Sequence, residues 1–236
     1  MTFKDVIRSS FMALGLLATM QSQAANLQVT VSNLTHGDYF TPLLIAGHDS
    51  ATHLFQLGSP ASLALQKMAE GGDLADLTTS LQGVGADLVS NPANGVLAPG
   101  ASITASLTTT ANNTHLSVVA MILPTNDGFV GIDALSIPTV PGTYHYDLNA
   151  YDAGTEANNE LIVSGSGAPN TLGIPADPGS HNGSNATGVT TVETNTNVHV
   201  HRGVLGDTNA TGGTSDLDAT IHRWLNPIAR LTIVVQ

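Results

Sequence analysis

The stretch that decides the fold is His115-Leu-Ser-Val-Val-Ala-Met-Ile-Leu123, followed at once by Pro124-Thr-Asn-Asp127-Gly128. From Val118 to Leu123 no polar residue interrupts it, and Pro, Asn and Gly follow directly. A short apolar run bounded by turn residues is typical of a buried strand. We therefore place this strand at the centre of the fold, with an acidic turn at its end.

The segments around this run show the other pattern of a strand, the alternation of apolar and polar residues. Leu27–Val31 alternates, and Ser102–Thr108 places Ile103, Ala105 and Leu107 on one face. Further strands are predicted at Thr41–Ala46, Val130–Ile137, Thr143–Leu148, Asn197–Gly203 and Pro227–Val235. Many short strands separated by turn signals predict an all-β fold, an antiparallel, C2-like β-sandwich.

One or two short helices interrupt this pattern. Ser59-Pro60 supplies a good N-cap and a good first residue, and Gly71-Gly72 ends the segment. A second short helix is predicted at Asp73–Leu81, and a single turn of helix at Leu217–His222.

The first residues have the features of an export signal. Lys4 and Arg8 precede a short apolar run, and Ala24-Ala25 offers a cleavage site. Residues 1–25 are thus predicted to be a signal peptide and residues 26–236 one β-domain. We expect a secreted or periplasmic protein without stable membrane insertion, because the apolar run is too short to span a bilayer.

Charge and residue usage exclude several functions. A formal net charge of −12 argues against binding nucleic-acid phosphates, and the absence of Cys excludes thiol catalysis. Ser164-Gly-Ser166-Gly lies in a polar stretch without a helix after it, so it is no nucleophile elbow. We expect a protein that is not an enzyme.

Acidic residues gather in two loops, Leu123–Asp133 and Ala150–Glu160, each rich in Asn and Gly. Hard cations such as Ca²⁺ take about 6–8 oxygen ligands from carboxylates, carbonyls and water. The same residues also form ordinary turns. The composition alone leaves both interpretations open.

Three motifs carry a resemblance to a known family: Pro124-Thr-Asn-Asp-Gly-Phe-Val-Gly131, Tyr151-Asp-Ala-Gly-Thr-Glu156 and Trp224-Leu-Asn-Pro-Ile-Ala-Arg-Leu-Thr232. Together they resemble the spondin domain, the N-terminal domain type of the animal matrix proteins F-spondin and mindin, which also occurs in exported bacterial proteins. The resemblance runs from about Leu27 to Val235.

The resemblance implies a C2-like β-sandwich that binds one Ca²⁺ through Asp127, Asp152 and Glu156. Glu156 stands where animal members usually carry Asp. Backbone carbonyls, water or neighbours would complete the shell, the neighbours being Asn126, Asp133, Asn158 and Glu160. The predicted function is a secreted, non-enzymatic calcium-binding module for adhesion or recognition. Its partner, an extracellular protein or glycan, is not identified, since animal partners do not carry over.

The histidines suggest an alternative function. His199 and His201 lie two apart on a predicted strand, so they share a face and could chelate Cu²⁺ or Zn²⁺. His48, His53 or His222 would supply the third ligand. The other interpretation is that these histidines make structural hydrogen bonds.

Overall fold

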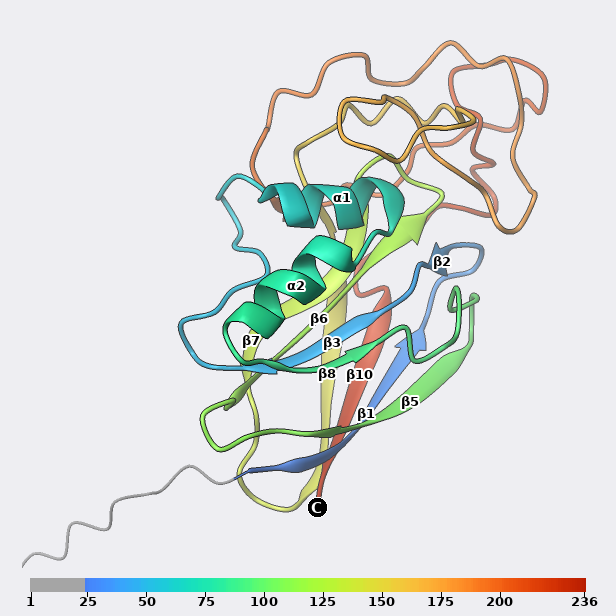
Figure 1. The fold of residues 1–236 in the computed structure, drawn as a ribbon. Coiled ribbons are helices and arrows are strands. Elements are labelled where there is room, and N and C mark those ends of the chain that lie inside the picture. The colour runs from blue at the N-terminus through green and yellow to red at the C-terminus, as the bar shows by residue number, and fades with distance from the viewer. Residues whose placement is uncertain (1–23) are drawn as a thin grey trace, which may run out of the picture.

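The computed structural model describes residues 24–236, so the predicted signal peptide lies outside the described residues except for Ala24 and Ala25. Residues 24–236 form a mostly antiparallel β-structure with two short helices (Figure 1). The elements are β1 (Asn26–Asn33), β2 (Tyr39–Phe40), β3 (Leu44–His48), α1 (Leu63–Gly71), α2 (Ala75–Gly83), β4 (Asp87–Ser90), β5 (Ser102–Thr108), β6 (His115–Leu123), β7 (Gly128–Ser136), β8 (Gly142–Asp152), β9 (His199–Val200) and β10 (Ala229–Val235). In this part of the chain neither helix has the length and apolar character needed to cross a bilayer.

The strands follow one continuous path, β4-β3-β6-β7-β8-β10-β1-β5, with β2 paired to β6 and β9 to β8. The long strand β8 joins the two halves of this path, because Gly142–Leu148 pairs with β10 and Asn149–Asp152 pairs with β7. At the two ends of the path, Asp87 Oδ2 accepts hydrogen bonds from Thr110 N at 2.6 Å and Asn113 Nδ2 at 2.8 Å. The antiparallel all-β prediction is confirmed, but the sheet is continuous and nearly closed rather than divided into two separate sheets.

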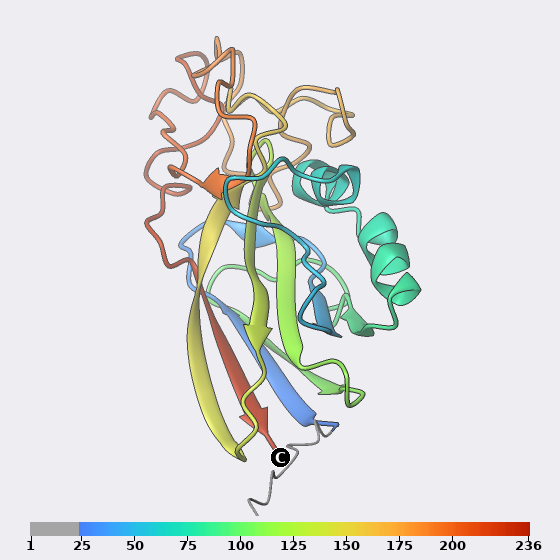
Figure 2. The same cartoon turned by 90° about the vertical axis from the view of Figure 1, so that its left-hand side faces the viewer.

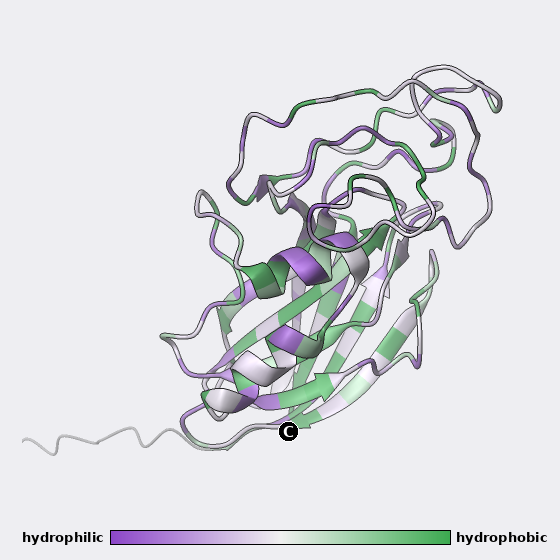
Figure 3. Ribbon diagram, turned by 45° about the horizontal axis from the view of Figure 1, so that its top comes forward, coloured by the Kyte–Doolittle hydropathy of each residue, from purple (hydrophilic) through white to green (hydrophobic). Residues whose placement is uncertain are grey.

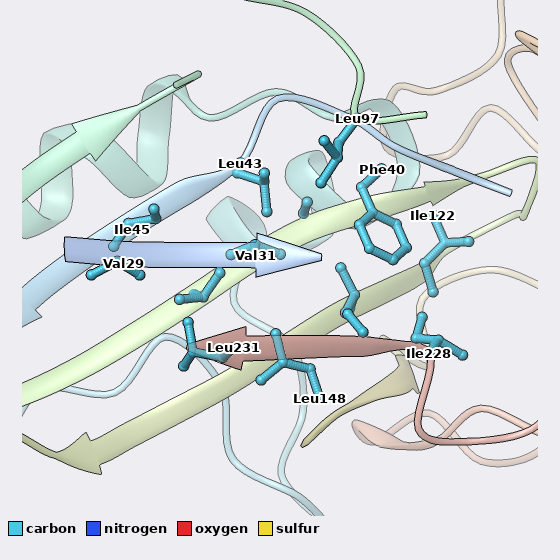
Figure 4. Packing of buried hydrophobic residues seen from close by; sticks show 14 of the residues in the cluster. Val29, Val31, Phe40, Leu43, Ile45, Leu97, Ile122, Leu148, Ile228 and Leu231 are labelled. Carbon is cyan, nitrogen blue, oxygen red and sulfur yellow. The ribbon is translucent and has the colours of Figure 1, made fainter. Parts of the chain in front are cut away.

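The main core lies between the two halves of the curved sheet. Alternate residues of β1 and β10, including Val29, Val31 and Leu231, face Ile45 of β3 and Ile122 of β6 (Figure 4). All five side chains are fully buried. The period-2 pattern of β1 and β5 predicted this arrangement, since strands at the surface bury only one face.

Strand β6 differs because it is buried on both faces. Leu116, Val118, Ala120 and Ile122 belong to the main core, while Val119, Met121 and Leu123 belong to a second apolar cluster beneath the helices. Figure 2 shows both helices on the side of β6 and β7 that faces away from β1 and β10. The uninterrupted apolar run therefore reflects a central strand, as predicted.

Helix α1 begins later than predicted. Its N-cap is Ser62, whose Oγ accepts a hydrogen bond from Leu65 N at 3.1 Å, and not Ser59. In the helix that starts there, Leu65 and Met68 pack into the second cluster. The preference of Ser for the N-cap does not by itself show which of the two serines is used. The predicted end is confirmed, since Gly72 adopts a left-handed φ of 71° as the C-cap. Helix α2 confirms the second predicted helix within two residues.

Three other predictions need correction. The segment Leu217–His222 forms turns rather than a helix, and the strand predicted at Asn197–Gly203 is reduced to the two residues of β9. Asp133 lies within β7 and not in a loop. The long polar stretches after β8 form irregular loops that gather at one end of the molecule, above α1 and opposite the C-terminus (Figure 1). Their largely polar colouring in Figure 3 contrasts with the apolar strands below.

Candidate cation site

The two acidic loops meet because β7 and β8 are neighbouring strands. Asp127 immediately precedes β7, and Asp152 is the last residue of β8, where it pairs with Gly128. Ala153 N donates to Asp127 O at 3.2 Å, which joins the starts of both loops. The register of one strand pair therefore brings together carboxylates that are 25 positions apart in their numbering.

Asp127 is fully buried, and only one of its carboxylate oxygens has a partner. Oδ2 accepts hydrogen bonds from Thr155 N at 2.8 Å and Glu156 N at 3.1 Å, while Oδ1 has none. Burial raises the pKa of Asp127 well above its usual range, and the charges of Asp152 and Glu156 act in the same direction. Asp127 is thus a buried acid with a free acceptor and acidic neighbours.

Glu156 repeats this arrangement. Its Oε1 accepts from Asn126 Nδ2 at 2.9 Å and from Gly173 N, while Oε2 is buried without a partner. Burial raises its pKa to about 7, against the opposing effect of these two hydrogen bonds. A second unpaired acceptor therefore lies in the same acidic region.

Asp152 differs, because both of its oxygens accept hydrogen bonds. Gly154 N donates to Oδ1 at 2.8 Å, and Asn158 Nδ2 donates to Oδ2 at 2.7 Å. His199 Nε2 lies 3.8 Å from Oδ2. The three acids that the family resemblance implies therefore lie in one region of the structure. Of these three, only Asp127 and Glu156 keep an unpaired carboxylate oxygen.

A family model described as Spondin_N matches residues 32–165, which is more than half of the chain. The chain belongs to the spondin N-terminal domain family. A search of curated proteins found no match. The matched segment includes Asp127, Asp152 and Glu156 but ends before His199 and His201.

The side chain of Asn126 organises this site of the spondin domain. Its Nδ2 donates to Glu156 Oε1 and Asn159 Oδ1, each at 2.9 Å, and its Oδ1 accepts from Glu160 N at 3.1 Å. Asn126 therefore joins the first loop to the second. Sequence reasoning had placed Asn126 only among possible ligands, because a loop Asn gives no sign of its distant partners.

Two of the other nearby candidates are used elsewhere in the spondin domain. Glu160 accepts hydrogen bonds from Leu205 N, Gly206 N and Ser215 Oγ at 2.6–2.8 Å, so both of its oxygens hold the C-terminal loop. Asp133 bonds His53 Nδ1 at 2.5 Å and Leu54 N at 2.7 Å. Asn158 remains beside the site through Asp152.

Glu70 of α1 is a buried acid of this region that sequence reasoning missed. It is 2% exposed, its Oε1 accepts from Gln66 Nε2 at 2.8 Å, and its Oε2 has no partner. Burial raises its pKa, and its charge contributes to the raised pKa of Glu156. The only signal in the sequence was an acid in the last turn of a short helix.

The five candidate histidines of the spondin domain fall into three neighbourhoods. His48 bonds Asp49 O and Ser117 Oγ, and Ser117 also contacts Asp133, the partner of His53. His222 lies beside Asp177, with 3.7 Å between Nε2 and Oδ2.

His199 and His201 are in the third neighbourhood, near Asp152. His201 Nδ1 accepts from Gly203 N at 3.0 Å, its buried Nε2 has no partner, and its ring lies 5.2 Å from that of Trp224. Burial lowers the pKa of His201 to about 4, so the ring is neutral at pH 7. In residues 24–236, no three His, Cys, Asp or Glu side chains stand ready as a metal centre.

Proposed function

We propose that this spondin domain is a secreted or periplasmic, non-enzymatic module in which one Ca²⁺ joins the two acidic loops. The observation that carries the proposal is the pair of buried, unpaired oxygens, Asp127 Oδ1 and Glu156 Oε2, beside Asp152. A buried carboxylate oxygen without a hydrogen bond is costly, and a hard cation is the ligand that offsets this cost.

In this proposal Asp127, Asp152 and Glu156 hold the ion. When bound, Ca²⁺ supplies positive charge and cross-links the loops; it takes no part in bond chemistry. Three carboxylates do not fill a shell of about 6–8 oxygens, so carbonyls or water complete it. Asp152 would exchange at least one of its present hydrogen bonds for the ion.

The proposed role follows from the place of the site. The site lies at the end of the curved sheet from which the polar loops project (Figure 1). An ion that fixes two of these loops would define a surface for adhesion or recognition of an extracellular protein or glycan. In this proposal, the nearly closed sheet corresponds to the C2-like β-sandwich that the family resemblance implies.

The test is Ca²⁺ binding by the mature chain, measured by calorimetry and by melting in Ca²⁺ and in chelator. A free Ca²⁺ concentration of about 100 Kd should add about 2.7 kcal/mol to the free energy of unfolding. Asp127→Asn should remove most of this gain, whereas Asp147→Asn, an exposed acid paired with Arg230, should keep it. Equal melting temperatures with and without Ca²⁺ in the wild type would refute the proposal.

A second candidate function, Cu²⁺ or Zn²⁺ binding by the histidines, is supported by His201 Nε2, which is buried and unpaired, and by the nearby His199. It predicts that replacing both with Ala abolishes Cu²⁺ uptake and leaves Ca²⁺ binding intact. An unchanged Cu²⁺ titration in the double variant would exclude it.

A further inference from the structure

Glu70 occupies a position that helix chemistry and solvation both disfavour. It lies in the last turn of α1, and this last turn contains no basic residue. The C-terminus of a helix carries partial negative charge, so an acid there is unfavourable, and burial adds a desolvation cost. A residue that violates two local rules in one place points to a functional constraint.

No Lys or Arg within residues 24–236 pairs with the charge of Glu70. The amide of Gln66, one turn earlier, bonds Oε1, and the side chain of Thr155 also lies against the carboxylate, but Oε2 is left buried and unpaired. In the described chain, the ion pairs of Lys and Arg join Lys67 to Asp76 and Arg230 to Asp147, and none involves Glu70. A side chain with this surplus of negative charge can be balanced by a proton or by an added cation.

Glu70 also lies next to the acidic site. The side chain of Thr155 is within hydrogen-bonding reach of both the Glu70 carboxylate and Asp127 Oδ2, the latter at 3.3 Å, and the charge of Glu70 acts on Glu156. Three buried oxygens without partners therefore belong to one chain of interacting acids: Glu70 Oε2, Glu156 Oε2 and Asp127 Oδ1. They come from a helix and two loops, so ordinary turn formation does not explain them together.

We propose that Glu70 is a fourth acidic residue of the cation site and that its carboxylate draws helix α1 into the binding of the ion. This inference rests on the proposed Ca²⁺ function and extends it to a part of the chain that lies far from both loops in sequence. The extra carboxylate raises the affinity of the site, since ligand charge is a main determinant of Ca²⁺ affinity.

The contacts of α1 make this coupling direct. The helix packs on β6 and β7 through Leu65, Met68 and Ala69, all of which lie in the second apolar cluster. The following residue, Gly71, lies so close to the backbone of Gly167 that a Cβ would collide with it. A ligand at Glu70 therefore holds both the helix and the loop above it.

The experiment uses Glu70→Gln, which keeps the size of the side chain and its capacity to bond Gln66 but removes the charge. Calorimetric titration with Ca²⁺ should give a Kd raised roughly 10- to 100-fold over wild type, as for other residues supporting a metal site. In chelator the variant should melt higher than wild type, because one repulsive buried acid is gone. In Ca²⁺ its gain in melting temperature should be smaller.

These opposite changes separate a role in ion binding from a purely structural one. Glu70→Asp, which keeps the charge but shortens the chain, should fall between wild type and Glu70→Gln. Asp76→Asn, which removes a half-exposed acid on α2, should bind Ca²⁺ like wild type. If Glu70→Gln binds Ca²⁺ as tightly as wild type, the inference on Glu70 is wrong while the calcium function stands. If wild type binds no Ca²⁺, both fail.

Discussion

Asp38 provides the sharpest test of how this fold tolerates buried charge. It lies just before β2, it is fully buried, and neither of its carboxylate oxygens has a partner. The charge that acts on it is that of Asp177, which repels it and which itself lies 3.7 Å from His222 Nε2. Burial, followed by the charge of Asp177, raises the pKa of Asp38 to about 8.

The sign of the resulting pH dependence follows from proton linkage. Between pH 4 and pH 8 the native state keeps the Asp38 proton, while the unfolded chain has lost it, so stability falls as pH rises. A rise from 3.8 to about 8 corresponds to about 6 kcal/mol at about 1.4 kcal/mol per pKa unit. Relaxation of the surrounding loops recovers part of this free energy. We therefore expect the free energy of unfolding to fall by about 2–6 kcal/mol between pH 4 and pH 8.

The perturbation is Asp38→Asn, which resembles the protonated acid and does not titrate. Urea unfolding at pH 4, 6 and 8 should give similar free energies for both proteins at pH 4 and a growing advantage for the variant toward pH 8. The acids of the cation site titrate alike in both proteins, so their contribution cancels in the difference. Parallel pH profiles for wild type and variant would show that Asp38 ionises freely and would refute the reasoning.

Two further predictions concern packing and titration. Gly71→Ala should destabilise the domain by about 1–3 kcal/mol in urea unfolding, because its Cβ would meet the carbonyl of Gly167. Gly83→Ala, with open space around the added Cβ, should change stability by no more than about 1 kcal/mol, and a similar loss in both would contradict the clash. NMR titration should show the His201 ring still neutral at pH 5.5, whereas a midpoint near 6.5 would mean that water reaches it.

Most of the fold could be predicted because its strands obey simple periodicities. The bounds of β5 and β6 match the predicted segments, and β1 differs by only one or two residues at each end. The start of helix α1 was missed because it depended on a choice between equivalent local signals. Ser59 and Ser62 are equally good caps, and only the packing of Leu65 and Met68 against β6 selects the second.

The site was predictable only where it follows strand ends. Asp127 lies just before the start of β7 and Asp152 ends β8, so their loops had to meet once β7 and β8 paired. Glu70 could not be found in this way, since helix periodicity places it on a face without saying what that face meets. The link between Asn126 and Asn159 is equally hidden, because it depends on the path of an irregular loop.

The charge balance of the chain separates a cation site from a mere accumulation of acids. Two acids that serve structure in this domain are paired: Glu160 accepts three hydrogen bonds, and Asp147 pairs with Arg230. Glu70, Glu156 and Asp127 each keep one buried oxygen unpaired. With only 6 Lys and Arg in 236 residues, the chain has few cations of its own to offer. In the calcium proposal, the charge that balances these acids therefore comes from a cation in solution.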